Sequence, residues 1–383
     1  MSKNLKIIKR SFVETLKKRF LEPNPLIQLI MGPRQVGKTT GVQQFLQGIK
    51  TPHHFVNADD QLSLSRDWSL EQWQIAQEKG HGTLLVIDEI QKVDNWAETI
   101  KKLWDAQVRK KSQIKLLLLG SSSLALTRGV SESLAGRFEI IPVYHWNYCE
   151  SNQAMPMDIA TYLKFGGYPK SYEFLDDYDR YIKYTKSSII ERVLDKDILQ
   201  FSTVKKPALF KHAFAVIASY PAQEISYRKI LGELQEKGNI ETIKYYISLF
   251  ESAYLIKTIP KYGSQDFKTK SSSPKIIPLA PCFYHLFSAN YEKEPFVFEA
   301  SVGMTLLQIS DELFYWRKGN DEVDFILRWQ KNLYAIEVKS GRKRRGQGLQ
   351  KFCELYSAKS LFITRENYCR FIQSPKDFLL NFS

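Results

Sequence analysis

The sequence predicts an α/β protein that begins with a parallel β-sheet, and three observations support this fold class. A glycine-rich loop at residues 32–39 (GPRQVGKT) follows an apolar run at 26–30 and precedes a segment at 40–48 that can form a helix. Further apolar runs at 84–88 and 115–119 are typical of strands buried in a parallel sheet. Apolar residues at helical spacing lie between these two runs, so strands and helices alternate along the chain.

The loop fits the pattern G-x-x-x-x-G-K-[ST] in the strand–loop–helix context that this pattern requires. Its glycines let backbone N–H groups point at phosphate oxygens, beside a helix N-terminus that favours anions. Lys38 is expected to reach the β- and γ-phosphates, and Thr39 to supply a hydroxyl to Mg²⁺. We therefore expect ATP and Mg²⁺ as cofactors, with GTP as the alternative nucleotide. The residues expected to contact the nucleotide are Gly32, Pro33, Arg34, Gln35, Val36, Gly37, Lys38, Thr39 and Thr40.

Polar side chains follow the other two predicted strands. The second apolar run ends in Asp88 and Glu89, and ligands gather at the carboxyl ends of parallel strands. Asp88 is expected to hold the Mg²⁺ shell, and Glu89 to polarise the water that attacks the γ-phosphate. The third run is followed by Ser121 and Ser122, whose hydroxyls are placed to sense the γ-phosphate. The alternative interpretation of these serines is the N-cap of the next helix.

The composition is that of a well-packed globular protein of two or three domains. The 383 residues carry a formal net charge of +14, and 43% of them are hydrophobic. Such a basic excess suits a polyanionic partner, with nucleic acid first and an acidic membrane surface second. Basic runs occur at 3–18, 109–111, 205–206 and 342–345.

The cysteine pattern and the hydropathy favour a cytoplasmic protein. Cys149, Cys282, Cys353 and Cys369 are scattered, with no C-x-x-C pair, so we expect reduced thiols and neither disulfides nor a zinc site. No apolar run approaches the roughly 18 residues that a membrane-spanning helix requires. The basic N-terminus lacks the apolar core of a signal peptide.

The order of four motifs, GPRQVGKT, LLVIDEIQ, LLLLGSSS and SLAGRFE, resembles the prokaryotic AAA-type P-loop ATPases that carry a nuclease-like C-terminal domain. The sequence FGGYP at 165–169 resembles the GGFP signature of that family. The resemblance covers almost the whole chain. It implies an AAA-type nucleotide-binding domain at 1–143, a helical lid at 144–206, and a sensor role for Ser121 or Ser122.

The resemblance also implies an arginine finger that reaches the nucleotide of a neighbouring subunit. Such an arginine neutralises charge on the transferred phosphoryl group. Arg137 is the first candidate, with Arg34 and Arg128 as alternatives, and a structural salt bridge is an equally open interpretation of Arg137. A finger that acts in trans implies a homo-oligomer, for which a ring is one arrangement.

Residues 207–263 predict a winged helix-turn-helix. Helices fit 208–219, 227–236 and 241–252, and an extended segment follows at 254–262. Three short helices and a hairpin, with a glycine-bearing turn, are typical of this module. The basic balance favours DNA as its partner, and a protein–protein or interdomain module is the alternative. The side chains expected to face DNA are Lys229, Thr242, Lys244, Tyr245 and Lys257.

Residues 264–383 are expected to form an α/β domain that resembles the PD-(D/E)xK nucleases. Alternating apolar residues predict two strands joined by a hairpin, with Asp324 on the first and Glu337 on the second. Because residues i and i+2 of a strand face the same side, Glu337 and Lys339 are expected to meet Asp324 in one pocket. In a working nuclease, Asp324, Glu337 and Glu299 would bind Mg²⁺, and Lys339 would orient the water. An amphipathic hairpin with surface charges is the alternative.

The sequence therefore predicts an ATP hydrolase that binds duplex or branched DNA and couples ATP turnover to DNA remodelling or translocation. Lys38, Glu89 and Arg137 are the residues expected to act on ATP. Mg²⁺-dependent cleavage by the C-terminal pocket would be an added activity. The alternative from another class is a nucleotide-controlled switch or scaffold with protein partners and no DNA-coupled activity.

Overall fold

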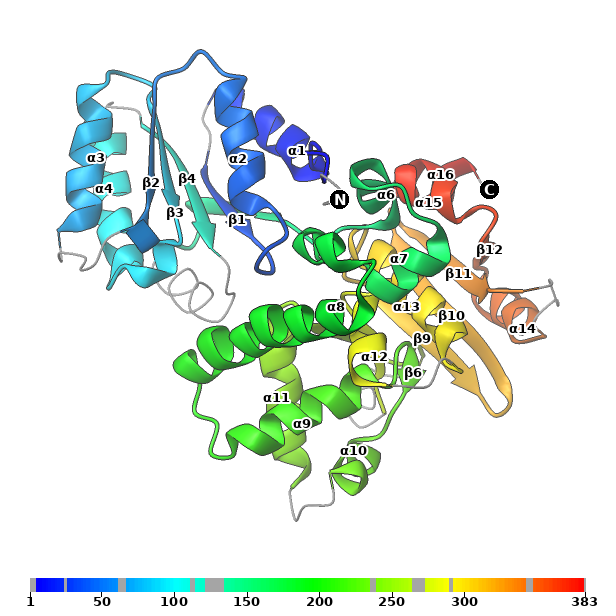
Figure 1. The fold of residues 1–383 in the computed structure, drawn as a ribbon. Coiled ribbons are helices and arrows are strands. Elements are labelled where there is room, and N and C mark those ends of the chain that lie inside the picture. The colour runs from blue at the N-terminus through cyan, green and yellow to red at the C-terminus, as the bar shows by residue number, and fades with distance from the viewer. Residues whose placement is uncertain are drawn as a thin grey trace. The chain divides into compact units, whose positions relative to one another are not determined.

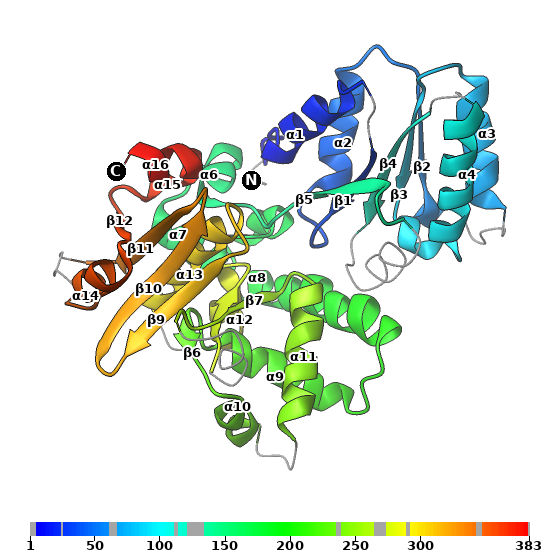
Figure 2. The same ribbon diagram turned by 180° about the vertical axis from the view of Figure 1, so that it is seen from behind.

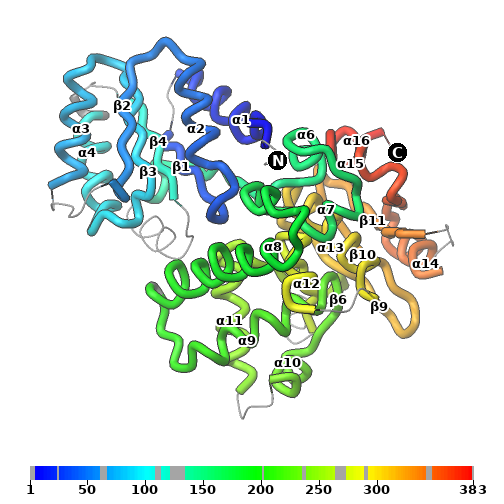
Figure 3. The backbone as a smooth tube through the Cα atoms, in the orientation of Figure 1, coloured from blue at the N-terminus to red at the C-terminus, as the bar shows by residue number. Residues whose placement is uncertain are grey.

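The chain forms two compact units in the computed structural model. The N-terminal unit comprises Ile7–Tyr144 and Glu191–Thr203, and the C-terminal unit comprises Met1–Lys6, His145–Ile190 and Val204–Ser383. Figures 1 and 3 trace the chain from blue at the N-terminus to red at the C-terminus. The residues that the structure describes are 5–23, 26–60, 67–110, 114–120, 134–234, 239–263, 273–288, 292–341 and 347–381.

Five parallel strands form the sheet of the N-terminal unit, in the order β2-β3-β4-β1-β5. The three strands predicted from apolar runs are present as β1, β3 and β4, which confirms an α/β fold with a parallel sheet. The sequences of β2 (HHFVN) and β5 (FEIIP) lack a continuous apolar run, and neither strand was predicted. The bounds are Ile27–Met31 for β1, His53–Asn57 for β2, Leu84–Asp88 for β3, Lys115–Gly120 for β4 and Phe138–Pro142 for β5.

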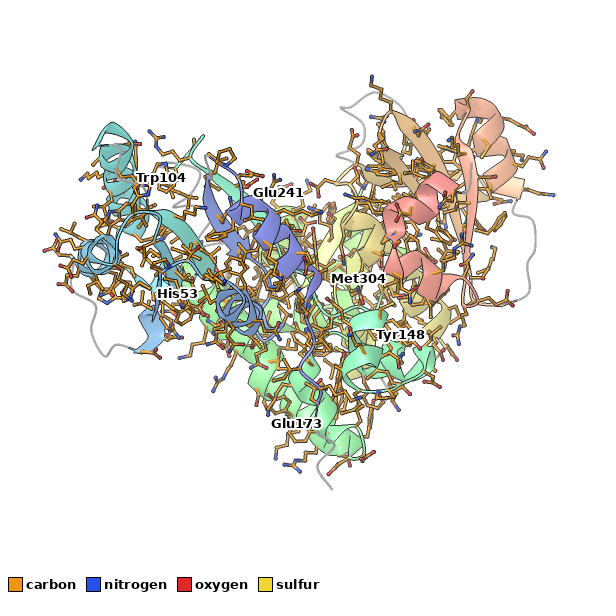
Figure 4. The ribbon with its side chains drawn as sticks, turned by 90° about the horizontal axis from the view of Figure 1, so that it is seen from above. His53, Trp104, Tyr148, Glu173, Glu241 and Met304 are labelled. Atoms are coloured by element: carbon orange, nitrogen blue, oxygen red, sulfur yellow. The ribbon has the colours of Figure 1, made fainter. Side chains whose placement is uncertain are left out.

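Helices cover both faces of this sheet (Figures 1 and 2), with α1 and α2 on one face and α3 and α4 on the other. Figure 4 labels His53 on β2 and Trp104 on α4. The helix predicted at 96–108 is α4, which continues to Lys110. The bounds are Ser11–Phe20 for α1, Lys38–Gln47 for α2, Trp68–Glu78 for α3 and Trp96–Lys110 for α4.

The segment expected to be a helical lid, 144–206, is helical but is divided between the two units. Its first part packs in the C-terminal unit as α6, α7, the 3₁₀ segment η3, α8 and the π-helical segment η4. Its second part, η5 and η6, packs in the N-terminal unit. The bounds are Tyr148–Ala154 for α6, Ile159–Phe165 for α7, Pro169–Phe174 for η3, Tyr178–Tyr184 for α8, Thr185–Ile190 for η4, Val193–Ile198 for η5 and Leu199–Phe201 for η6.

The FGGYP sequence forms a buried turn in the C-terminal unit. Gly167 has a φ of +116°, and a Cβ at this position would lie 2.8 Å from the Cβ of Ala280. Its N–H donates to the Tyr172 hydroxyl at 3.2 Å, and its carbonyl accepts from the Trp146 N–H at 3.2 Å. Only glycine tolerates this backbone conformation at so close a contact, so the motif is explained here by packing.

Three helices and a small antiparallel sheet follow in the C-terminal unit. The helices predicted at 208–219, 227–236 and 241–252 correspond to α9, α10 and α11. Their sheet has the order β6-β8-β7, and β8 lies beyond residue 263, the expected end of this segment. The bounds are Pro207–Ala218 for α9, Gln223–Glu224 for β6, Tyr227–Glu233 for α10, Ile240–Ser252 for α11, Ile256–Ile259 for β7 and Lys275–Pro278 for β8.

The last part of the chain is a four-stranded sheet in the order β12-β11-β10-β9, in which only β11 and β12 pair in parallel. Ile336 and Val338 of β11 pack in one core with α13, and Ala335 packs in a second core with Phe352 of α14. The sheet therefore has α13 on one face and α14 on the other. The bounds are Cys282–Phe287 for α12, Glu294–Leu307 for α13, Leu313–Lys318 for β9, Asp321–Trp329 for β10, Asn332–Lys339 for β11, Gln347–Tyr356 for α14, Lys359–Thr364 for β12, Tyr368–Gln373 for α15 and Pro375–Asn381 for α16.

Within the described ranges, every helix is too short or too polar to cross a membrane.

Candidate functional site

The glycine-rich loop connects the end of β1 to the start of α2. Gly37 has a φ of +86°, a left-handed conformation that glycine adopts at little cost, and the helix begins directly after it. A Cβ on Gly32 would lie 2.1 Å from the Val143 carbonyl oxygen, so only glycine fits between β1 and the chain that leaves β5. These two glycines place the loop at the carboxyl edge of the sheet.

Lys38 is buried inside the loop and holds it closed on itself. Its Nζ donates to the carbonyl oxygens of Gly32 at 2.9 Å and Pro33 at 2.6 Å. Burial lowers the pKa of Lys38 to about 8, and the charges of Glu89 and Asp88 act in the opposite direction. A buried ammonium that donates to neutral carbonyl oxygens is a site that a phosphate oxygen would satisfy better, because it adds charge to the hydrogen bond.

Thr39 and Asp88 form the direct link between the loop and β3. The Thr39 hydroxyl donates to Asp88 Oδ2 at 2.6 Å, and the Glu89 N–H donates to Asp88 Oδ1 at 2.9 Å. Asp88 is 2% exposed, and burial raises its pKa. Glu89 has a φ of +53°, a strained conformation for a residue with a side chain, and its carboxylate accepts from the Gln91 amide. The structure thus brings together Lys38, Thr39, Asp88 and Glu89.

The remaining loop residues differ in their surroundings. Val36 is fully buried, and its carbonyl accepts from the guanidinium of Arg10. Gln35 is exposed with a φ of +57°, and Thr40 is exposed on α2. Gln35 and Thr40 therefore have room to contact a ligand, whereas Val36 supports the loop from inside.

Arg34 makes the longest-range contact of the loop. Its Nε donates to both carboxylate oxygens of Asp197, at 2.8 and 2.6 Å. Asp197 lies on η5, and its side chain is 3% exposed. Burial acts to lower the pKa of Arg34, but the hydrogen bond to Asp197 and the charge of Asp197 outweigh burial. The pKa of Arg34 is therefore raised above its usual value. The loop is thereby tied to a segment 163 residues further along the chain.

Arg137, the first candidate for an arginine finger, is engaged within its own unit. Its Nε and Nη2 donate to the two carboxylate oxygens of Asp105 at 2.7 and 3.0 Å, and its Nη1 donates to the Ala135 carbonyl at 3.0 Å. A structural salt bridge was the alternative to the arginine finger in the sequence analysis of Arg137, and the structure contains that salt bridge. Ser121, Ser122 and Arg128 lie outside the described residues.

The C-terminal acids are each engaged by a basic side chain or by the backbone. The Glu337 carboxylate accepts from Lys339 Nζ, and the Glu299 carboxylate accepts from Lys275 Nζ. Asp324 Oδ2 accepts from the Val338 N–H at 2.7 Å. Glu337 and Lys339 share one side of β11, as the i, i+2 spacing predicted.

Glu299 and Glu337 approach Asp324 from opposite faces of the sheet. Ala335 packs on the α14 face, and side chains alternate along a strand, so Glu337 lies on that face as well. Glu299 comes from α13, on the other face. Burial raises the pKa of Glu299 to about 8 and that of Glu337 to about 6, in each case with the Asp324 charge as the next cause.

The two sites differ in their fit to Mg²⁺. At the loop, a hydroxyl and a carboxylate meet beside a buried lysine, which is a donor set that suits Mg²⁺ held between protein and phosphate. Nowhere in the described part of the chain do three or more His, Cys, Asp or Glu side chains group so as to hold a metal. The expectation that Asp324, Glu337 and Glu299 form a metal site does not fit this arrangement, because Lys275 binds the Glu299 carboxylate and because Glu299 and Glu337 lie on opposite faces of the sheet.

Sequence reasoning missed two residues of these sites, Asp197 and Lys275. Asp197 lies in a helical stretch rich in charged residues, and nothing marks it as a partner of the loop. Lys275 precedes the apolar residues of β8, where a lysine ordinarily marks the exposed start of a strand. An aspartate in the helix and a lysine before the strand carry no spacing signal, so each was visible only in three dimensions.

The family comparisons divide the chain into three parts. Residues 24–152 match a family model described as an AAA domain. Residues 157–281 and 294–375 match two models described as domains of unknown function, DUF8612 and DUF4143. The first match, together with the loop and the parallel sheet, supports an AAA P-loop ATPase domain in the N-terminal part of the chain.

Two proteins with no assigned function are similar along most of their length. An uncharacterized protein of Methanocaldococcus jannaschii is 27% identical over 349 residues, which are 83% of this chain and 75% of that protein. An uncharacterized protein of Mycobacterium tuberculosis is 25% identical over 344 residues, which are 87% of this chain and 74% of that protein.

Among solved structures, the chain is similar to Aeropyrum pernix Orc1 in complex with DNA, at 11% identity and a TM-score of 0.34, over 74% of this chain and 93% of that chain. It is also similar to the Thermotoga maritima RuvB Holliday junction branch migration motor, at 14% identity and a TM-score of 0.33, over 64% of this chain and 85% of that chain.

Proposed function

We propose that this protein is an ATPase of the AAA type that binds DNA and couples ATP turnover to DNA remodelling or translocation. The observation that carries the ATPase part is the contact of Thr39 with Asp88 beside the buried Lys38. This contact joins the loop after β1 to the acids after β3, across the carboxyl edge of the sheet. Ligands of open α/β sheets bind at this edge.

In this proposal Lys38 leaves the Gly32 and Pro33 carbonyls and donates to the phosphates instead. Thr39 and Asp88 would hold Mg²⁺, which would neutralise charge on the phosphate oxygens. Glu89 orients and polarises the attacking water, and Gln91 positions the Glu89 carboxylate. Arg137 acts in trans in a homo-oligomer only after it leaves Asp105, so we propose it as a conditional finger.

The DNA-binding part of the proposal rests on the α9–β8 segment and on charge. Its element order, helix, strand, two helices and two strands with the sheet β6-β8-β7, supports our proposal that this segment is a winged helix-turn-helix. Lys244 and Tyr245 are exposed on α11, and Lys229 is exposed on α10. Lysines on such a face contact phosphates and position the protein on the duplex.

A nucleotide-controlled switch is a second candidate, favoured by the pair of Arg34 and Asp197. This pair ties the loop to Glu191–Thr203, a segment whose two neighbours in sequence both belong to the C-terminal unit. A nucleotide phosphate that recruits Arg34 would release Asp197. Nucleotide binding would then change how Glu191–Thr203 is held, and this segment is joined at both ends to the C-terminal unit. This change would not require DNA.

ATP hydrolysis measured with no DNA, single-stranded DNA, duplex DNA and branched DNA tests the proposal. Stimulation by at least one form is expected for the wild type, and Lys38→Ala should lower the rate about hundredfold or more in every condition, since the phosphates lose their main cation. The matched control is Lys50→Ala, an exposed lysine after α2 that should leave the rate unchanged. Equal rates with and without every DNA form would overturn the coupling and favour the switch.

A further inference from the structure

We propose that Lys275 takes the place of a divalent cation in the C-terminal pocket, so that this domain binds no metal there and does not cleave nucleic acid. The inference concerns the C-terminal unit and is independent of the ATPase and DNA-binding proposals. It gives the acids of this pocket a structural role in joining β8 to α13 and β10.

The pocket is a cavity of about 290 Å³ between the small sheet and the C-terminal sheet, both within the C-terminal unit. Lys275 enters it from β8, Glu299 from α13 and Asp324 from β10. Its rim carries further charge from Glu224, Arg317 and Glu322. Three elements that are distant in sequence therefore direct ionic groups into one small space.

Lys275 is held in this space from several sides. Its Nζ donates to the Glu299 carboxylate and to the Asp324 carbonyl oxygen, the latter at 3.1 Å. The same ammonium lies 4.8 Å from the centroid of the Phe325 ring. Lys275 is 8% exposed, so few water molecules compete for it. The carboxylate, the carbonyl oxygen and the aromatic face together compensate the ammonium for the water that it loses on burial.

Most carboxylates of the pocket are bound by a basic side chain without a metal. Four acids line it, and of these Glu299 is bound by Lys275, and Glu224 and Glu322 are bound by Arg317. A divalent ion beside Glu299 would meet the Lys275 ammonium at close range. That repulsion is strong where water is scarce, because the local dielectric is low.

The acids that line the pocket mark where a cation would bind if Lys275 were absent. Removing the Lys275 charge would leave Glu299 and Asp324 as oxygen donors, and oxygen donors are the ligands that Mg²⁺ and Mn²⁺ prefer. The structure therefore predicts that a single substitution converts this pocket from metal-free to metal-binding.

Binding of Mn²⁺ to the full-length protein without nucleotide, followed by electron paramagnetic resonance, tests this inference. The wild type should show no Mn²⁺ binding at this pocket, and Lys275→Ala should bind one ion with an affinity at least about tenfold above the detection limit set by the wild type, since one repelling charge has been removed. Lys275→Met, which keeps the apolar stem, is the second variant if Lys275→Ala does not fold. Lys275→Arg, which keeps the charge, should remain metal-free.

The double variant Lys275→Ala/Asp324→Asn assigns the ion to this pocket, because it should lose the binding that Lys275→Ala gained. Two results would overturn the inference. The first is a Mn²⁺ ion, or Mg²⁺-dependent DNA cleavage, in the wild type that Asp324→Asn abolishes. The second is the absence of any gain in folded Lys275→Ala and Lys275→Met.

Discussion

Lys38 and Lys275 show two uses of a buried lysine in one chain. Lys38 rests on two carbonyl oxygens, which are neutral acceptors, and burial lowers its pKa to about 8. Lys275 rests on a carboxylate as well as a carbonyl, and its pKa is raised because Glu299 and Asp324 outweigh burial. The first lysine would gain by meeting an anionic ligand, whereas the second already has its anion.

His285 is buried on α12 and should make the C-terminal unit sensitive to acid. Burial, assisted by the charge of Lys164, lowers the pKa of His285 from 6.5 to about 4, and Glu294 opposes the shift. The unfolded chain therefore binds more protons between pH 6.5 and 4, so the free energy of unfolding falls as the pH falls through this range. The loss through this residue approaches roughly 3 kcal/mol at pH 4.

Urea unfolding at pH 6.5, 5.5 and 4.5 measures this dependence. His285→Gln should flatten the decline, because its side chain does not titrate, and His53→Gln, at an exposed histidine on β2, should leave it unchanged. Identical pH dependence in His285→Gln and the wild type would contradict the prediction.

Among individual residues, the sequence predicted those whose chemistry depends on local spacing. Lys38 and Thr39 are set by the loop pattern, and Asp88 and Glu89 by the end of an apolar run. Their partners Gly32 and Pro33 lie within the same loop. Residues whose role depends on a distant partner were not predictable, because a pairing across 163 residues leaves no periodic trace.

Between elements, the bond of Arg34 to Asp197 fastens η5 to the loop before α2. Arg34→Ala should destabilise the N-terminal unit by about 3 kcal/mol, because it leaves the Asp197 carboxylate buried without this cation. Asp197→Asn should cost less, since an amide can still accept one bond. The double variant should cost less than the sum of the two, since each removes the same interaction.

A double-mutant cycle on the free energy of unfolding measures that coupling. The matched control is the pair of Arg137 and Asp105, whose two side chains are 31% and 37% exposed. Water screens that pair, so its cycle should give little coupling. Additive effects of the Arg34 and Asp197 substitutions would show that the bond does not hold η5 in place.

Elements with strong periodic patterns were predicted, and those that depend on their neighbours were not. β3 and β4 are continuous apolar runs with buried residues throughout or nearly so. β2 is largely half-buried and contains two histidines, and in β5 at the sheet edge Ile141 is the one fully buried residue. Both exist because a neighbouring strand pairs with them, and pairing partners are not encoded in a short window of sequence.

For the whole molecule, a net charge of +14 predicts strongly salt-dependent DNA affinity. The logarithm of the binding constant should fall linearly with the logarithm of the salt concentration, because phosphate contacts release counterions. Lys229→Gln and Lys244→Gln should each lower that slope by about 1, if each lysine contacts one phosphate. Fluorescence anisotropy with labelled duplex DNA, at salt concentrations from about 50 to about 200 mM, measures this slope.

Lys376→Gln, at an exposed lysine on α16, is the control that should leave the slope unchanged. It removes the same charge from the net total as the other two variants. An equal decrease in all three would mean that net charge, and not the α10–α11 face, governs binding.

The division of the molecule into units was the least predictable feature. Helical periodicity in 144–206 identified helices, but an apolar stripe does not specify which core it will cover. The chain places residues 145–190 in one unit and 191–203 in the other.

The division of the N-terminal unit into two separate chain segments limits how its gene can recombine. The nucleotide-binding unit is not a contiguous stretch of gene, since a fragment ending at Tyr144 would omit Asp197 and with it the carboxylate that receives Arg34. A gene fragment exchanged at Tyr144 would therefore encode an N-terminal unit that lacks its segment Glu191–Thr203. We therefore expect the two units to be inherited together, so that the N-terminal unit and the C-terminal unit evolve as one gene.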